Sequence, residues 1–125
     1  MTRIRTFAIA LAAGLASSAG HAQQIQPKVT LSIDVPAEAA VHSVTYGCGD
    51  GISLPVSYIN ADPNFLAIVP VEGKSIVFAS VISGSGARYA AGKYEWWSKG
   101  DDASLRDLTR DENAEPILEC KVSPN

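Results

Sequence analysis

Ser85 and Lys99 are the two residues of this chain whose types and surroundings could do chemistry together. Ser85 lies in the run 83–89, SGSGARY, and Lys99 lies in the run 96–100, WWSKG. A hydroxyl and an ammonium both donate hydrogen bonds, and such bonds are strong when the acceptor is charged. Side by side, the two groups would suit a pair of carboxylates on a partner.

The spacing of the two runs predicts a β-hairpin that brings Ser85 and Lys99 together. Residues 87–90 and 93–98 alternate in character, and Ala91-Gly92 between them suits a two-residue turn. Pairing across this turn places Ser85 opposite the residue before Lys99. Opposed Cβ atoms on an antiparallel pair lie about 4.5 to 5.5 Å apart, so the two groups could reach one small target.

The residues around the serine and the lysine are typical of a surface that contacts a partner. Gly84 and Gly86 flank the serine without side chains, so the backbone can approach another surface closely. Neighbouring strand residues point to opposite faces. We therefore expect Trp96 in the core and Trp97 exposed on the outer face beside the lysine, as at many binding surfaces. A Gly-Ser-Gly run taken alone is typical of a plain turn.

The beginning of the chain has the pattern of a secretory signal peptide. Two arginines come first, an apolar run covers residues 7–15 and small residues cover 17–22. The apolar run is too short to span a bilayer, which takes about 20 residues. We expect cleavage after Ala22, or alternatively after Ala19. Neither position is followed by the cysteine of a lipid-anchored lipoprotein, so the mature protein is expected to be exported without a membrane anchor.

The charge of the mature chain favours basic partners. Removal of residues 1–22 from the 125 leaves 103 residues with eight Lys or Arg against thirteen Asp or Glu, a formal charge of −5. Such a surface disfavours nucleic acid, whose binding requires cations to neutralise phosphates. It attracts basic proteins through long-range steering.

Short alternating runs punctuated by turn residues predict a single all-β domain, a sandwich or a barrel. The domain is expected over residues 41–125, after an extension over 23–40 that carries one strand. Residues 105–111 equally fit a short helical turn. The expected strands cover residues 29–35, 41–48, 52–59, 65–70, 75–82, 88–90, 93–99, 103–109 and 117–121.

Cys48 and Cys120 are the two cysteines of the chain. In an oxidising compartment we expect them to form a disulfide. A bridge that closes a loop of about 70 residues would stabilise the fold by roughly 4 kcal/mol in the chain-entropy model. No metal site or cofactor is expected, because two cysteines without a nearby histidine make a poor zinc site.

Ser85 does not have the surroundings of a catalytic serine, and we expect no enzymatic activity. The residues around it, ISGSG, differ from the G-x-S-x-G nucleophile elbow. A serine nucleophile normally needs a base within hydrogen-bond reach. The one histidine of the mature chain, His42, is far away in the sequence and is expected on the surface of a strand.

With the export signal, the two cysteines and the SGSGARY and WWSKG motifs in view, the chain resembles the MliC/PliC family of bacterial inhibitors of c-type lysozyme. The resemblance covers roughly residues 41–121. It implies an antiparallel eight-stranded β-barrel with a Cys48–Cys120 disulfide. Because the lipid-attachment motif is absent, the chain is similar to the periplasmic type. Residues 23–40 lie beyond the shared core, and whether the protein is a monomer or a homodimer stays open.

The resemblance also implies how such an inhibitor acts. Ser85 and Lys99 match the family residues that enter the active-site cleft of lysozyme and reach its catalytic carboxylates. Arg88 and Tyr89 match trailing residues that hold the shape of the loop. The full set of expected lysozyme-binding residues is Ser83, Gly84, Ser85, Gly86, Arg88, Tyr89, Trp97 and Lys99. A different class of function is an envelope module that uses Trp97 to bind a glycan or another periplasmic protein.

Overall fold

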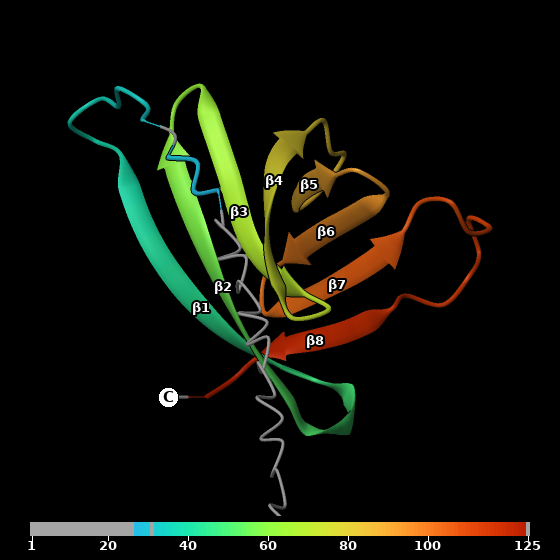
Figure 1. Ribbon diagram of the computed structural model, residues 1–125. Helices are drawn as coiled ribbons and strands as arrows, with labels where there is room; N and C mark the ends of the chain where they lie inside the picture. Colours follow the sequence, from blue (N-terminus) through green and yellow to red (C-terminus); the bar gives the residue numbers. More distant parts are fainter. Residues whose placement is uncertain (1–26, 31, 125) are drawn as a thin grey trace, which may run out of the picture. The chain divides into compact units, whose positions relative to one another are not determined.

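The chain forms a closed antiparallel β-barrel of eight strands. The computed structural model describes residues 27–30 and 32–124. Each strand pairs with the next, and β8 returns to β1 (Figure 1). The strands are β1 (Ala40–Cys48), β2 (Ile52–Ala61), β3 (Asn64–Val71), β4 (Lys74–Val81), β5 (Ala87–Ala91), β6 (Tyr94–Lys99), β7 (Asp102–Asp107) and β8 (Leu118–Val122).

The strand prediction after residue 40 is confirmed, and of the two expected architectures the protein adopts the barrel. Each of the eight strands lies within one or two residues of the bounds expected from alternation. The strand, and not the alternative of a helical turn over 105–111, is present: β7 continues to Asp107 and an irregular loop follows. Within residues 27–30 and 32–124, no helix is long and apolar enough to cross a membrane.

The strand expected over residues 29–35 is wrong. The described residues of that range are irregular, and a turn closed by a hydrogen bond from the Ala39 amide to the Pro36 carbonyl follows them. Alternation selects a face, but a strand also needs a neighbour that accepts and donates its backbone hydrogen bonds. None of the strand pairings of the described residues includes this segment. The expected signal peptide, residues 1–22, lies outside the described residues.

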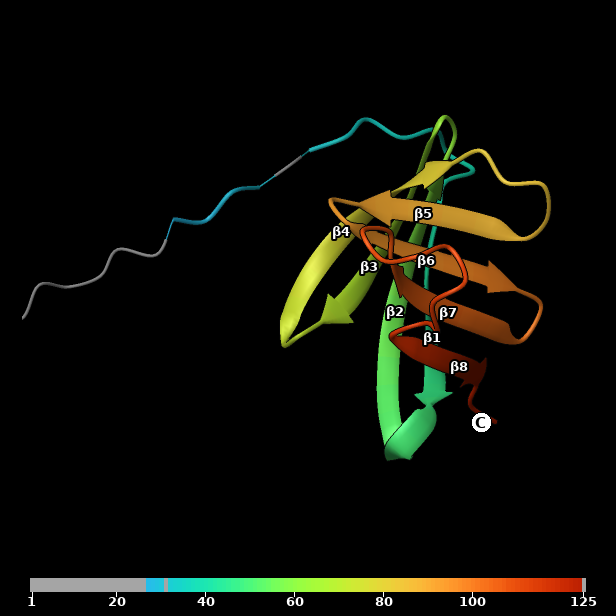
Figure 2. The same cartoon turned by 90° about the vertical axis from the view of Figure 1, so that its right-hand side faces the viewer.

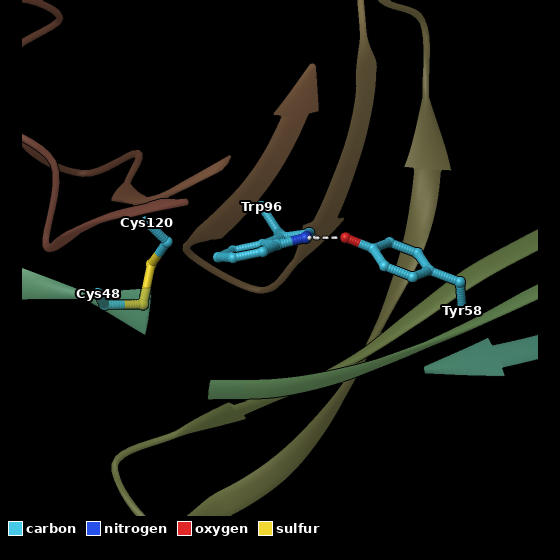
Figure 3. Close-up of a disulfide and its surroundings, with 4 residues drawn as sticks. All are labelled: Cys48, Tyr58, Trp96 and Cys120. Carbon is cyan, nitrogen blue, oxygen red and sulfur yellow. Dashed lines mark hydrogen bonds between the residues drawn. A yellow bond between two sulfur atoms is a disulfide. The ribbon is translucent and has the colours of Figure 1, made fainter. Parts of the chain in front are cut away.

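Trp96 lies in the barrel core, as predicted from the alternation of side chains along its strand. Its side chain is completely buried, and its indole nitrogen donates to the Tyr58 hydroxyl at 2.9 Å (Figure 3). The Tyr58 and Tyr46 hydroxyls are 2.9 Å apart, and burial together with this contact raises the pKa of Tyr46. The polar atoms of the Trp96, Tyr58 and Tyr46 side chains therefore all have hydrogen-bond partners, which keeps the cost of desolvating these three buried rings low.

The disulfide lies at one of the shortest seams of the barrel. The β1–β8 ladder contains three residue pairs, and Cys48 stands directly opposite Cys120 in the last of them. The two cysteines are buried and joined, with their Cα atoms 4.0 Å apart (Figure 3). The β1–β2 ladder, in contrast, has nine pairs. The covalent bond thus supplements the few hydrogen bonds that close the barrel.

Replacing both cysteines by alanine should destabilise the barrel by about 2 to 5 kcal/mol. The loop that the bridge closes spans 72 residues, so its removal returns much conformational freedom to the unfolded chain. Urea unfolding of the oxidised protein and of the Cys48→Ala/Cys120→Ala variant measures the difference. Equal midpoints would show that the hydrogen bonds close the β1–β8 seam without help.

Candidate functional site

The β5–β6 hairpin carries the residues of the candidate site, but its register differs from the expected one by two residues. Ala91 pairs with Tyr94, so the turn is Gly92-Lys93 and not Ala91-Gly92. Gly92 has a φ of 54°. A turn with positive φ at its first central residue uses this glycine, whereas the expected turn would have forced an alanine into that conformation. A shift of two keeps every side chain on its predicted face.

The corrected register leaves Ser85 outside the β5–β6 ladder. Ala87, and not Ser85, stands opposite Ser98. Ser85 belongs instead to the loop over residues 82–86, which joins β4 to β5 at the same end of the barrel as the β6–β7 turn (Figure 2). The contact between Ser85 and Lys99 must therefore come from the conformation of this loop.

Contacts within the loop and contacts with β6 fix the conformation of the loop. The Trp97 indole nitrogen donates to the Ser85 carbonyl oxygen at 3.0 Å, and the Ser83 hydroxyl donates to the same oxygen at 2.6 Å. Gly86 has a φ of 65°, and a Cβ on it would overlap the Ser98 carbonyl oxygen. Only glycine allows the loop to turn this close to the strand. Trp97 is consequently half-buried, and not freely exposed as expected.

Ser85 and Lys99 meet at the exposed edge of this site. The Lys99 ammonium lies 3.4 Å from the Ser85 hydroxyl oxygen, and both residues are exposed. Lys99 stands opposite Asp102 in the β6–β7 ladder, yet Asp102 pairs with Lys121 at 2.7 Å. This contact raises the pKa of Lys121. Within the described residues, none of the salt bridges includes Lys99, so its charge is available to a partner.

Both groups of the pair offer hydrogen-bond donors to a partner. When Lys99 donates to the Ser85 oxygen, the hydroxyl hydrogen stays free, and the ammonium retains two further hydrogens. In the described residues, Lys99 is the side chain that hydrogen-bonds this hydroxyl, and an ammonium is not a base. His42, which is exposed on β1, stacks on Tyr58 with ring centroids 5.3 Å apart. The arrangement fits recognition of an anionic acceptor and lacks the base of a nucleophilic serine.

Glu95 is a residue of the site that the sequence reasoning missed. It points to the outer face of β6 but is only 6% exposed, because the Arg88 side chain pairs with its carboxylate. The Arg88 Nε donates to Glu95 Oε2 at 3.0 Å, and Arg88 Nη1 reaches the Ile82 carbonyl at 3.4 Å. Arg88 therefore ties the start of the loop to the hairpin. An arginine and a glutamate on one face of a hairpin are the signal that could have identified this pair.

Not all of the expected binding residues reach the surface. Tyr89 is buried in the core, where its ring tilts against Tyr58, and burial raises its pKa. Its position allows it to support the loop from below but not to contact a partner, so its inclusion among surface contacts was wrong. Gly84 is exposed at the tip of the loop and Ser83 is half-buried.

Comparison with known proteins gives consistent family matches. A family model described as membrane-bound lysozyme-inhibitor of c-type lysozyme matches residues 46–114. A Cupriavidus necator protein named membrane-bound lysozyme inhibitor of C-type lysozyme is 42% identical over 119 residues, which cover 94% of this chain and 91% of that protein. A Pseudomonas aeruginosa protein of the same name is 47% identical over 76 residues, which cover 60% of each chain.

Solved structures of two inhibitors have the same fold. The crystal structure of Pseudomonas aeruginosa MliC in complex with hen egg white lysozyme matches with a TM-score of 0.64 and 39% identity, over 79% of this chain and 100% of that chain. PliC-St, the periplasmic lysozyme inhibitor of C-type lysozyme from Salmonella typhimurium, matches with a TM-score of 0.58 and 25% identity, over 68% and 100%. The resemblance seen in the motifs is confirmed, and the chain belongs to the family of membrane-bound inhibitors of c-type lysozyme.

Proposed function

We propose that this protein inhibits c-type lysozyme by placing the Ser85–Lys99 pair in the active-site cleft of that enzyme. Two relatives are named as inhibitors of C-type lysozyme, and a similar structure contains a complex with hen egg white lysozyme. The observation that carries the mechanism is the exposed Lys99 ammonium, 3.4 Å from the Ser85 hydroxyl and outside the salt bridges of the described residues.

The chemistry of the target matches this pair of donors. A retaining glycosidase such as lysozyme uses two carboxyl groups about 5 to 5.5 Å apart, one as the acid and the other as the nucleophile or stabiliser. The ammonium can bind one carboxylate and the free hydroxyl hydrogen of Ser85 can bind the other. In a cleft from which water is excluded, charge-assisted hydrogen bonds are stronger than in water.

Binding of this kind blocks catalysis in two ways. An ammonium beside the catalytic acid favours its ionised form, so the acid loses the proton that it must donate to the leaving group. The loop also occupies the position of the sugar. Inhibition should therefore be competitive with substrate. The protein acts as a binding partner of an enzyme and performs no catalysis itself.

The proposed site of action is the bacterial envelope. The names of the similar proteins describe them as membrane-bound or periplasmic. The signal-peptide pattern over residues 1–22 and the disulfide fit an exported protein in an oxidising compartment. There the inhibitor would protect the cell wall from lysozyme that crosses the outer layers.

Lys99→Ala should weaken binding to c-type lysozyme by about 2 to 5 kcal/mol, because it leaves buried carboxylates without a charged partner. Ser85→Ala should cost about 1 to 3 kcal/mol through one lost hydrogen bond. Inhibition of cell-wall lysis by a titrated series of each variant measures both effects. Lys74→Ala, which removes an exposed lysine at the start of β4, is the matched control. Full potency of both site variants would contradict the assignment.

Gly86→Ala should lose most of its inhibitory activity, because the new Cβ would force the loop away from Ser98 and separate Ser85 from Lys99. The left-handed conformation at this position also costs about 1 to 3 kcal/mol for a residue other than glycine. Gly92→Ala has a similar positive φ but open space around its Cβ. It therefore controls for backbone strain, and its inhibition constant should stay close to that of the natural protein. Equal potency of the two variants would show that the loop tolerates displacement.

The acidic surface should accelerate association with a basic lysozyme. The formal charge of −5 over residues 23–125 attracts a cationic enzyme at long range, and salt screens this attraction. We expect the association rate constant to fall about tenfold or more between low and high salt, with a smaller change in the dissociation rate constant. Stopped-flow fluorescence at several ionic strengths measures both. A constant association rate would remove the steering effect from the mechanism.

A further inference from the structure

We infer that Val81 and Ile82 form an apolar contact surface for the rim of the lysozyme cleft, beside the Ser85–Lys99 tip. This inference rests on the proposed function and extends the binding site beyond its polar centre. Ile82 immediately precedes the SGSG segment, and Val81 ends β4. We call these two residues the apolar lip.

The apolar lip is exposed to an unusual degree. Ile82 is 95% exposed, the highest value among the large apolar side chains of the described residues, and Val81 is 43% exposed. The core of the barrel does not use the Ile82 side chain, so packing within the fold does not explain it. Burial of an isoleucine side chain in an interface is favourable, which makes this position an anchor for a partner.

The backbone that carries the lip is held in place. The Arg88 guanidinium reaches the Ile82 carbonyl at 3.4 Å, and the same side chain is paired with the buried Glu95 carboxylate. Arg88 also stands opposite Val81 in the β4–β5 ladder. A fixed backbone presents the isoleucine without a large loss of chain entropy on binding, as a preorganised contact requires.

The surface beside the lip is hollowed. Ser80, Val81, Ile82 and Arg88 line an open pocket on this side of β4 and β5. Two apolar walls and one guanidinium suit an apolar or carbonyl-bearing group that projects from a folded partner. The pocket and the Ser85–Lys99 pair share the loop over residues 82–86, so one partner could contact both.

The size of a stable interface requires contacts beyond the tip. Specific complexes bury about 800 Å² on each partner, from roughly 20 to 30 residues. The tip consists of residues 83–86 and Lys99, which are too few. On the other side of Lys99, the exposed Asp101 carboxylate would repel the carboxylates of the target, and Asp102 is paired with Lys121. The apolar lip is the adjoining surface that can be desolvated at low cost.

Ile82→Ser tests the inference, with Leu108→Ser as its matched control. Leu108 is also an exposed aliphatic residue, but it follows Asp107 at the opposite end of the β6–β7 ladder from Lys99. We expect Ile82→Ser to raise the inhibition constant for hen egg white lysozyme about 10- to 100-fold, mainly through a faster dissociation rate. Leu108→Ser should change it less than twofold. Because Ile82 is exposed in the free protein, both variants should retain the melting temperature.

The possible outcomes separate this inference from the proposed function. If Lys99→Ala loses inhibition while Ile82→Ser keeps the constants of the natural protein, the apolar lip is not a contact and the proposed function stands. If surface plasmon resonance shows that the natural protein does not bind lysozyme, the proposed function fails and the apolar lip fails with it. If Ile82→Ser loses affinity for lysozyme while Ile82→Val keeps it, the result supports an apolar contact at this position.

Discussion

The hydrogen bond from the Trp97 indole nitrogen to the Ser85 carbonyl is the interaction on which the candidate site depends. The β5–β6 ladder ends at Ala87, so strand pairing alone does not position the serine. The bond holds the loop against β6, and Gly86 permits the close approach. Because its neighbour Trp96 is locked in the core, the strand that presents Trp97 and Lys99 has a fixed orientation. Packing inside the barrel thereby helps to fix the geometry of the candidate site on its surface.

Most of the fold could be predicted from the sequence, because the alternation of apolar and polar residues and the positions of turn residues depend on local structure. Because neighbouring strand residues point to opposite faces, Trp96 was expected inside and Trp97 outside. Two cysteines in a chain with a signal-peptide pattern predicted the disulfide. The segment over 29–35 shows the limit of this reasoning. Its alternation is as clear as that of the true strands, but a strand forms only where a neighbour is free to pair.

The candidate site was less predictable, because it depends on contacts between residues outside the regular ladders. The motifs identified Ser85 and Lys99, but the turn was placed one residue too early and the resulting register was wrong by two. The pair still meets because the loop bends toward β6, a conformation that no periodicity reveals. Glu95 is buried on an outward face since the long Arg88 side chain covers it. The position of a residue along a strand predicts the face to which its side chain points. Whether that side chain is buried depends on which other side chains cover it.

The free charge of Lys99 results from competition among its neighbours. Asp102 stands directly opposite Lys99 in the β6–β7 ladder and would be its natural partner. Lys121 on β8 also stands opposite Asp102, from the other side, and forms the salt bridge. Because one aspartate lies between two lysines, the ion pair forms away from the loop and the Lys99 ammonium turns to the Ser85 hydroxyl. An acidic chain can thus present a cationic tip, and under the proposed function this tip would enter an acidic cleft while the overall charge would attract the basic enzyme that contains the cleft.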